Sequence, residues 1–162
     1  MNQINPIKFL AILFLSNFFE SYTAPVLIGI LVSLPITFLV FSFIIYRSKN
    51  NTNALYALGI GLYIDLISNT FFGLNGILFC LITYVINSYS NTFKLFSYLQ
   101  ICFFFGASSV FFIGLSNLFL AIENFSYLIL LVSFFFNIGL TLLIAMSPIY
   151  RISVDRRLSE YD

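Results

Sequence analysis

The stretch Ala57-Leu-Gly-Ile-Gly61-Leu-Tyr-Ile-Asp65-Leu-Ile-Ser68-Asn-Thr-Phe-Phe-Gly73 is apolar apart from one carboxylate near its middle. Ala57, Gly61, Asp65 and Ser68 are spaced by four, four and three residues, so in a helix they share one face. A carboxylate at membrane depth costs at least a few kcal/mol unless it faces protein or water. We therefore expect Asp65 to point into a helical bundle, with small residues such as Gly61 allowing close packing around it.

The composition of the 162-residue chain predicts an all-α integral membrane protein. Apolar residues make up 60% of the chain and charged residues only 8%, whereas soluble domains carry about 25% charged residues. Seven basic and six acidic side chains nearly cancel, so no charge excess favours binding to nucleic acid. Cys80 and Cys102 both lie in apolar runs, which favours buried hydrophobic roles over a disulfide framework or a zinc site.

Six apolar segments predict six transmembrane helices in a single polytopic domain covering residues 1–162. A spanning helix needs about 20 apolar residues, and the candidates cover residues 7–24, 25–46, 54–71, 74–89, 95–120 and 127–148. The first segment lacks a strongly basic start and a small-residue cleavage motif, so we expect it to be retained. With a cytoplasmic N-terminus, every basic residue falls on the cytoplasmic side and Glu20 and Glu123 fall outside. This agreement with the positive-inside rule predicts that both termini are cytoplasmic.

The second segment allows two interpretations because Pro35 lies in its middle. A proline inside a helix removes a backbone hydrogen bond and usually bends the helix. Residues 25–46 can form one kinked helix, which we favour. Alternatively, the helix begins near Pro35 with Ser33 as its cap, and residues 26–34 form a half-membrane or interfacial piece. Non-helical backbone at that depth has to be covered by protein.

The third and fourth helices are joined only by residues 69–73, so we expect a tight antiparallel hairpin. In that hairpin Asp65 lies about 10 Å below the loop, near the level of Cys80. The hydroxyl of Tyr84, one turn deeper on the fourth helix, is then a candidate hydrogen-bond partner for Asp65.

The last helix carries a second polar stripe. Small and polar residues recur every four positions at Ser133, Asn137, Thr141 and Ala145. Such a stripe marks a packed face in a membrane helix, and Asn137 is the best candidate for an interhelical hydrogen bond.

The sequence offers little for catalysis. It contains no His, and no Ser or Cys stands near a Lys in a catalytic pattern. Acid–base chemistry needs converging groups, but Asp65 is the one acid in the predicted membrane interior. We expect no enzyme activity, no metal and no cofactor. Transporters usually show several intramembrane charges or paired broken helices, so transport is poorly supported.

The same stretch resembles the core of the rod shape-determining protein MreD family. That family has a Gly-x-x-x-Asp-Leu sequence, a glycine eight residues after the Asp and a Tyr in the next helix, and the chain matches at Gly61, Asp65, Gly73 and Tyr84. The chain length, the six segments, a proline in the second segment, Asn137 in the last one and a basic C-terminal end also fit. The specific match covers only residues 57–86.

Two positions depart from the family pattern. Ala57 stands where a glycine is common. The Leu34-Pro35-Ile36 sequence lacks the polar residue that often follows the family's proline.

The resemblance implies a non-catalytic scaffold in the bacterial cell-elongation machinery, needed for rod shape and lateral peptidoglycan synthesis. Such a protein lies in the cytoplasmic (inner) membrane, contacts membrane lipids and binds the single-span protein MreC. Through MreC it connects indirectly to MreB-like filaments and to peptidoglycan synthases. The implied fold is that of the membrane subunits of energy-coupling-factor transporters. This supplies the alternative function: a subunit that binds a vitamin-type small molecule.

Overall fold

The computed structural model describes residues 6–48, 53–68, 71–120 and 127–146, and these residues are almost entirely α-helical. The described helices are α1 (Pro6–Ile28), α2 (Ile36–Arg47), α3 (Ala54–Ser68), α4 (Leu74–Ser88), α5 (Ser90–Leu95), α6 (Tyr98–Leu120) and α7 (Tyr127–Met146). No strand occurs within the described ranges. The all-α prediction is therefore confirmed.

Two helix pairs form the most extensive contacts, α3 with α4 and α6 with α7. Glycines permit the first: a Cβ atom on Gly61 would lie 2.5 Å from the Asn75 carbonyl oxygen, so only glycine fits there. In the second pair, a Cβ on Gly106 would collide with the side chain of Ile138. Close approach of backbones at small residues is the usual basis of helix association in lipid.

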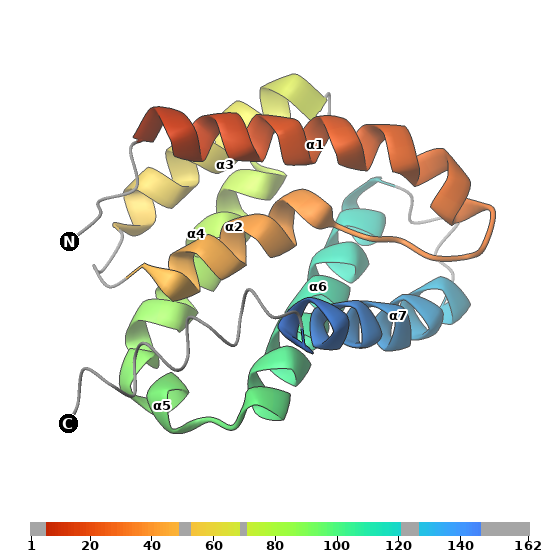
Figure 1. Cartoon of the computed structure of the whole chain (residues 1–162). Helices are drawn as coiled ribbons and strands as arrows, with labels where there is room; N and C mark the ends of the chain where they lie inside the picture. The colour runs from red at the N-terminus through yellow and green to blue at the C-terminus, as the bar shows by residue number, and fades with distance from the viewer. Residues whose placement is uncertain (1–5, 49–52, 69–70, 121–126, 147–162) are drawn as a thin grey trace.

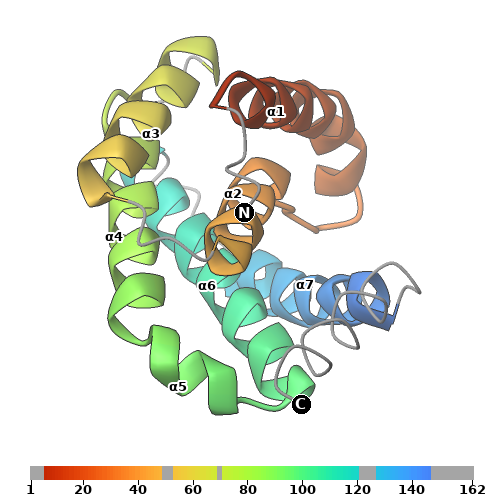
Figure 2. The same ribbon diagram turned by 60° about the vertical axis from the view of Figure 1, so that its left-hand side comes forward.

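Helix α2 lies at the centre of the molecule, between α1 on one side and α4 and α6 on the other (Figures 1 and 2). Its aromatic side chains form the middle of the core. The Phe41 ring stacks on Phe79 of α4 with centroids 4.1 Å apart, and the Phe38 ring lies 4.6 Å from that of Phe112 on α6. The short α2 is thus fixed by aromatic packing on two neighbouring helices.

Pro25 and Pro35 have roles opposite to those expected. Helix α1 continues through Pro25 to Ile28, and α2 begins only after Pro35. The prediction of a kinked helix over residues 25–46 is wrong. Its alternative, a helix that begins near Pro35, describes α2 correctly, although Pro35 itself is the N-cap residue and no side chain caps it. Proline fits a helix start because its missing N–H is not needed there.

The remaining boundaries lie close to prediction, with two differences. Helix α6 begins at Tyr98, three residues after the expected start, and residues 90–94, expected as a linker, lie in the short α5. The described part of α3 runs to Ser68, and residues 69–70 of the expected helix lie outside the described residues. Several of the charged residues used in the topology prediction lie outside the described residues, and the structure does not describe the side chains of some others. They include Lys49 and Glu123 and the arginines of the tail beyond residue 146.

By length and composition, two described helices could cross a membrane: Lys8–Ile28 and Leu99–Phe119. Four shorter apolar helices accompany them, covering residues 36–46, 54–68, 74–88 and 127–142. On α1, the large apolar side chains of Leu15, Phe18, Tyr22 and Val26 are exposed on one face, at spacings of three, four and four. A contiguous apolar stripe of this kind marks contact with lipid or another protein.

Candidate functional site

Asp65 is buried between α3 and α4, with 2% of its surface exposed. Its Oδ2 atom accepts hydrogen bonds from the Gly73 N–H at 2.9 Å and the Gly76 N–H at 3.4 Å. Its Oδ1 atom accepts from the Asn75 N–H at 3.2 Å and from the Asn75 side-chain amide at 2.7 Å. The carboxylate thus holds the first turn of α4 from the neighbouring helix.

The start of α4 explains why a carboxylate is needed at this point. The first four N–H groups of a helix have no partner within the helix. The N-cap residue of α4 is Gly73, which has no side chain to satisfy them and adopts a φ of 97°. Asp65 supplies the missing acceptors, and its negative charge lies at the positive end of the α4 dipole. The capping role joins α3 to α4 in addition to their glycine contact.

The stripe that contains Asp65 faces the protein, as predicted. Ala57 and Asp65 are buried, and Gly61 packs against the backbone of α4. At the end of α3, the Ser68 hydroxyl accepts a 2.7 Å hydrogen bond from the Asn17 side chain of α1. One helical face therefore joins α3 to two different helices.

The predicted contact between Asp65 and Tyr84 is wrong. Tyr84 is 66% exposed on the outer side of α4, while Asp65 lies at the level of Gly73 to Gly76, two turns or more from it along α4. The prediction placed Asp65 opposite the middle of α4, whereas its hydrogen bonds reach the start of that helix.

Asn137 and Ser133 on α7 hold the non-helical segment between α1 and α2. The Ser33 N–H donates to the Ser133 hydroxyl at 2.8 Å, and the Asn137 side-chain amide donates to the Ser33 carbonyl at 3.4 Å. Both α7 side chains are fully buried. The predicted interhelical role of Asn137 is confirmed in part, since its partner is a linker backbone. Thr141 lies on the same face, and its hydroxyl donates to the Ile138 carbonyl within α7 at 2.9 Å and to the Cys102 carbonyl of α6 at 3.5 Å.

Glu20 is a second acid that reaches a helix start, and the sequence prediction missed it. It was expected at the outer rim, yet its Oε2 atom accepts a 2.8 Å hydrogen bond from the Thr37 N–H in the first turn of α2. A signal was available: α2 begins after a proline, which has no capping side chain, so an acceptor had to come from elsewhere. Asp65 and Glu20 thus play the same part for α4 and α2.

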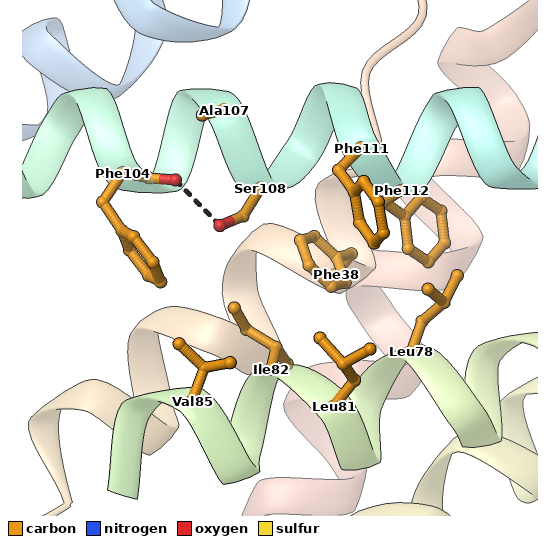
Figure 3. Close-up of a pocket in the computed structure, with 10 residues that line it drawn as sticks. All are labelled: Phe38, Leu78, Leu81, Ile82, Val85, Phe104, Ala107, Ser108, Phe111 and Phe112. Atoms are coloured by element: carbon orange, nitrogen blue, oxygen red, sulfur yellow. Dashed lines mark hydrogen bonds between the residues drawn. The ribbon is translucent and has the colours of Figure 1, made fainter. Parts of the chain in front are cut away.

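An apolar groove separates α4 from α6, with Phe38 of α2 behind it (Figure 3). Its volume is about 250 Å³. The side chains that line it are Phe38, Leu78, Leu81, Ile82, Val85, Phe104, Ala107, Ser108, Phe111 and Phe112. We call it the α4–α6 groove.

Both acids accept hydrogen bonds from N–H groups at helix starts. Asp65 accepts hydrogen bonds from backbone and amide donors, and in the described part of the chain no three His, Cys, Asp or Glu side chains gather. The arrangement of the polar groups is that of a structural framework. No protein-family model, no curated protein and no solved structure matches the chain.

Proposed function

We propose that the chain is a non-catalytic, multi-pass membrane scaffold of the MreD kind, which binds an MreC-like single-span protein in the bacterial cell-elongation machinery. The observation that carries the proposal is the position of Asp65. The acid that stands out in the sequence holds the α3–α4 hairpin together through the start of α4. A scaffold needs a rigid surface of this kind more than it needs a reactive group.

The exposed apolar side chains support a location in the membrane. They occur on α1, α3, α4, α6 and α7, and on α1 they form the continuous stripe described above. Soluble monomers rarely expose contiguous apolar patches larger than a few hundred Å². Six crossings, with both termini in the cytoplasm of a bacterial inner membrane, are part of the proposal.

The short length of α2 and the covered non-helical segment before it also support a membrane protein. Twelve residues rise only about 18 Å, less than the roughly 30 Å hydrocarbon core. In the proposed topology the non-helical segment before α2 makes up the difference. Its Ser33 backbone is satisfied by Ser133 and Asn137 of α7. Irregular backbone at membrane depth is tolerated when protein covers it in this manner.

Three of the four residues that carry the MreD resemblance meet in one place. Gly61, Asp65 and Gly73 all lie at the α3–α4 contact, and Gly73 donates directly to Asp65. Tyr84 is different, because it points outward from α4. We therefore assign the first three residues to the framework and propose Tyr84 as a contact for the partner.

Co-purification tests the partner. The tagged chain is extracted from membranes in mild detergent together with the MreC-like protein of the same bacterium, and the ratio of the two is measured. We expect a stable complex that Tyr84→Ala weakens and that Tyr63→Ala on α3 leaves unchanged; Tyr63 is also exposed. Absence of the MreC-like protein from a folded wild-type preparation would contradict the proposed function.

Mass spectrometry of the same preparation distinguishes the scaffold from the alternative function, a subunit that binds a vitamin-type small molecule. A vitamin-binding subunit would retain a polar small molecule on extraction, at a stoichiometry near one. The α4–α6 groove is a poor site for such a molecule, because its lining presents almost entirely hydrocarbon. A retained vitamin-type compound in the absence of the MreC-like protein would favour the alternative.

A further inference from the structure

The start of α2 is a place where segments far apart in the chain meet. Its first turn lies between α1 on one side and α6 and α7 on the other (Figure 1). Glu20 of α1 accepts from the Thr37 N–H in this turn, and Asn137 of α7 donates to the Ser33 carbonyl just before it. We call the side chains of Glu20, Thr37 and Asn137 the α2-start cluster.

The Glu20 carboxylate is far less well satisfied than that of Asp65. Asp65 accepts at least four hydrogen bonds, shared between both of its oxygens. Among the residues that the structure describes, Glu20 accepts one side-chain hydrogen bond, at Oε2. The one basic side chain described, Lys8, is twelve residues away on the same helix, about 18 Å. A charge that is removed from water is normally paired or bound to a metal ion, so the partly buried Glu20 lacks a positive partner.

Two neutral oxygens of the cluster also lack partners. Thr37 is 5% exposed and Asn137 is fully buried, yet within the described ranges neither Thr37 Oγ1 nor Asn137 Oδ1 takes part in a hydrogen bond. The Thr37 hydroxyl lies beside the Glu20 carboxyl without making a well-formed hydrogen bond to it. Unpartnered polar atoms in a protein interior call for an explanation such as an ordered water or an ion.

The chemistry of these three groups selects a small monovalent cation. Carboxylate, hydroxyl and amide oxygens are the ligands of hard cations, and an anion would be repelled by Glu20. A single carboxylate balances one positive charge, whereas Ca²⁺ sites usually draw on several carboxylates. In membrane proteins, Na⁺ is commonly coordinated where a helix is interrupted by non-helical backbone, as the chain is between α1 and α2.

We propose that the α2-start cluster binds one sodium ion. Glu20 Oε1 is the charged ligand, and Thr37 Oγ1 and Asn137 Oδ1 are the neutral ligands. Because Glu20 is partly exposed, the ion can reach the site from its side. The ion joins α1 and α7 to the start of α2, in addition to the hydrogen bonds already made there. The site does not involve the MreC-like partner, so it can be tested separately from the proposed function.

Protection from a carbodiimide tests the site. Dicyclohexylcarbodiimide modifies protonated carboxyl groups in apolar surroundings, and a bound Na⁺ competes with the proton. The full chain in mild detergent is treated in NaCl or in choline chloride of equal ionic strength, and the modified residues are mapped by peptide mass spectrometry. We expect Glu20 to be modified severalfold more slowly in NaCl. Asp65, whose oxygens are occupied by N–H groups, is the internal control and should show no dependence on Na⁺.

Two matched variants test the ligand set. Thr37→Val should raise the Na⁺ concentration needed for half protection about tenfold, which corresponds to about 1.4 kcal/mol. Thr83→Val removes a hydroxyl that is equally buried and unpartnered but lies on α4, and it should leave protection unchanged. Because neither hydroxyl has a hydrogen-bond partner in the described part of the chain, both variants should fold.

Thermal unfolding supplies a readout that does not need the carbodiimide to reach Glu20. Na⁺ at about ten times its Kd should raise the melting temperature of the wild type by about 3–6 °C over choline, and Glu20→Gln should abolish this rise. Modification of Glu20 at equal rates in both salts, with no rise in melting temperature, would show that the carboxyl binds only a proton and would overturn the site. An equal rise in the wild type and in Glu20→Gln would overturn it as well.

Discussion

Replacement of Asp65 by alanine should destabilise the protein through the start of α4. The substitution removes the acceptor of three backbone N–H groups and of the Asn75 side-chain amide. Loss of a helix cap costs about 0.5–2 kcal/mol, and each buried donor left without a partner costs about 1–3 kcal/mol. Asn75 and Gly76 donate from buried positions. With the two backbone N–H groups of these residues unsatisfied, we expect a loss of roughly 3–4 kcal/mol.

Thermal unfolding in detergent measures this loss. For a domain of this size, 1 kcal/mol shifts the melting temperature by about 2–4 °C, so Asp65→Ala should melt roughly 10 °C below wild type. Asp65→Asn should fall between the two, because one side-chain oxygen remains while an amide N–H faces the other donors. The matched control is Ser68→Ala on the same stripe, which loses one neutral hydrogen bond worth about 0.5–1.5 kcal/mol.

Amide hydrogen exchange shows whether the cap itself is responsible. The amides of Gly73, Asn75 and Gly76 should exchange much faster in Asp65→Ala, while those in the middle of α6 should not change. Equal melting temperatures for Asp65→Ala and Ser68→Ala, together with unchanged exchange at these amides, would refute the capping role.

Three further predictions concern the helix contacts. Gly61→Ala should cost about 1–3 kcal/mol through overpacking against α4, whereas Gly59→Ala, which meets nothing within 4 Å, should be neutral or slightly stabilising in the same melting assay. Gly73→Ala should cost about 1–2 kcal/mol because a left-handed φ strains an L-residue; an unchanged melting temperature would show that this turn can relax. Ser133→Ala should speed hydrogen exchange at the Ser33 amide, since that N–H loses its 2.8 Å acceptor, and retained protection there would indicate another acceptor.

The sequence predicted much of the helical framework because apolar length and helical spacing are local signals. The bounds of α3, α4, α6 and α7 lie close to expectation, and the inward face with Gly61 and Asp65 is confirmed. Asn137 was correctly placed on a packed face. These properties follow from a period of 3.6 residues and from the cost of a lone acid in apolar surroundings.

The errors arose where a helix end depends on a distant residue. Pro25 and Pro35 cannot be distinguished by their local sequence, since each can either interrupt or begin a helix. What separates them is tertiary: Glu20 satisfies the start of α2, and α7 satisfies the linker before it. The partner of Asp65 was missed for the same reason, because the level at which α3 and α4 pack is a tertiary property, and it brings Asp65 to the start of α4.

The central claim is that these helices cross a membrane several times, and single-cysteine accessibility tests it most directly. Cys80 and Cys102 are replaced by alanine, and one cysteine is placed at residue 30, 53, 72 or 97, each in a described segment between helices. In sealed vesicles of known orientation, a membrane-impermeant maleimide should label positions 53 and 97 from the cytoplasmic side and positions 30 and 72 from the opposite side. Labelling of all four positions from one side would contradict the account.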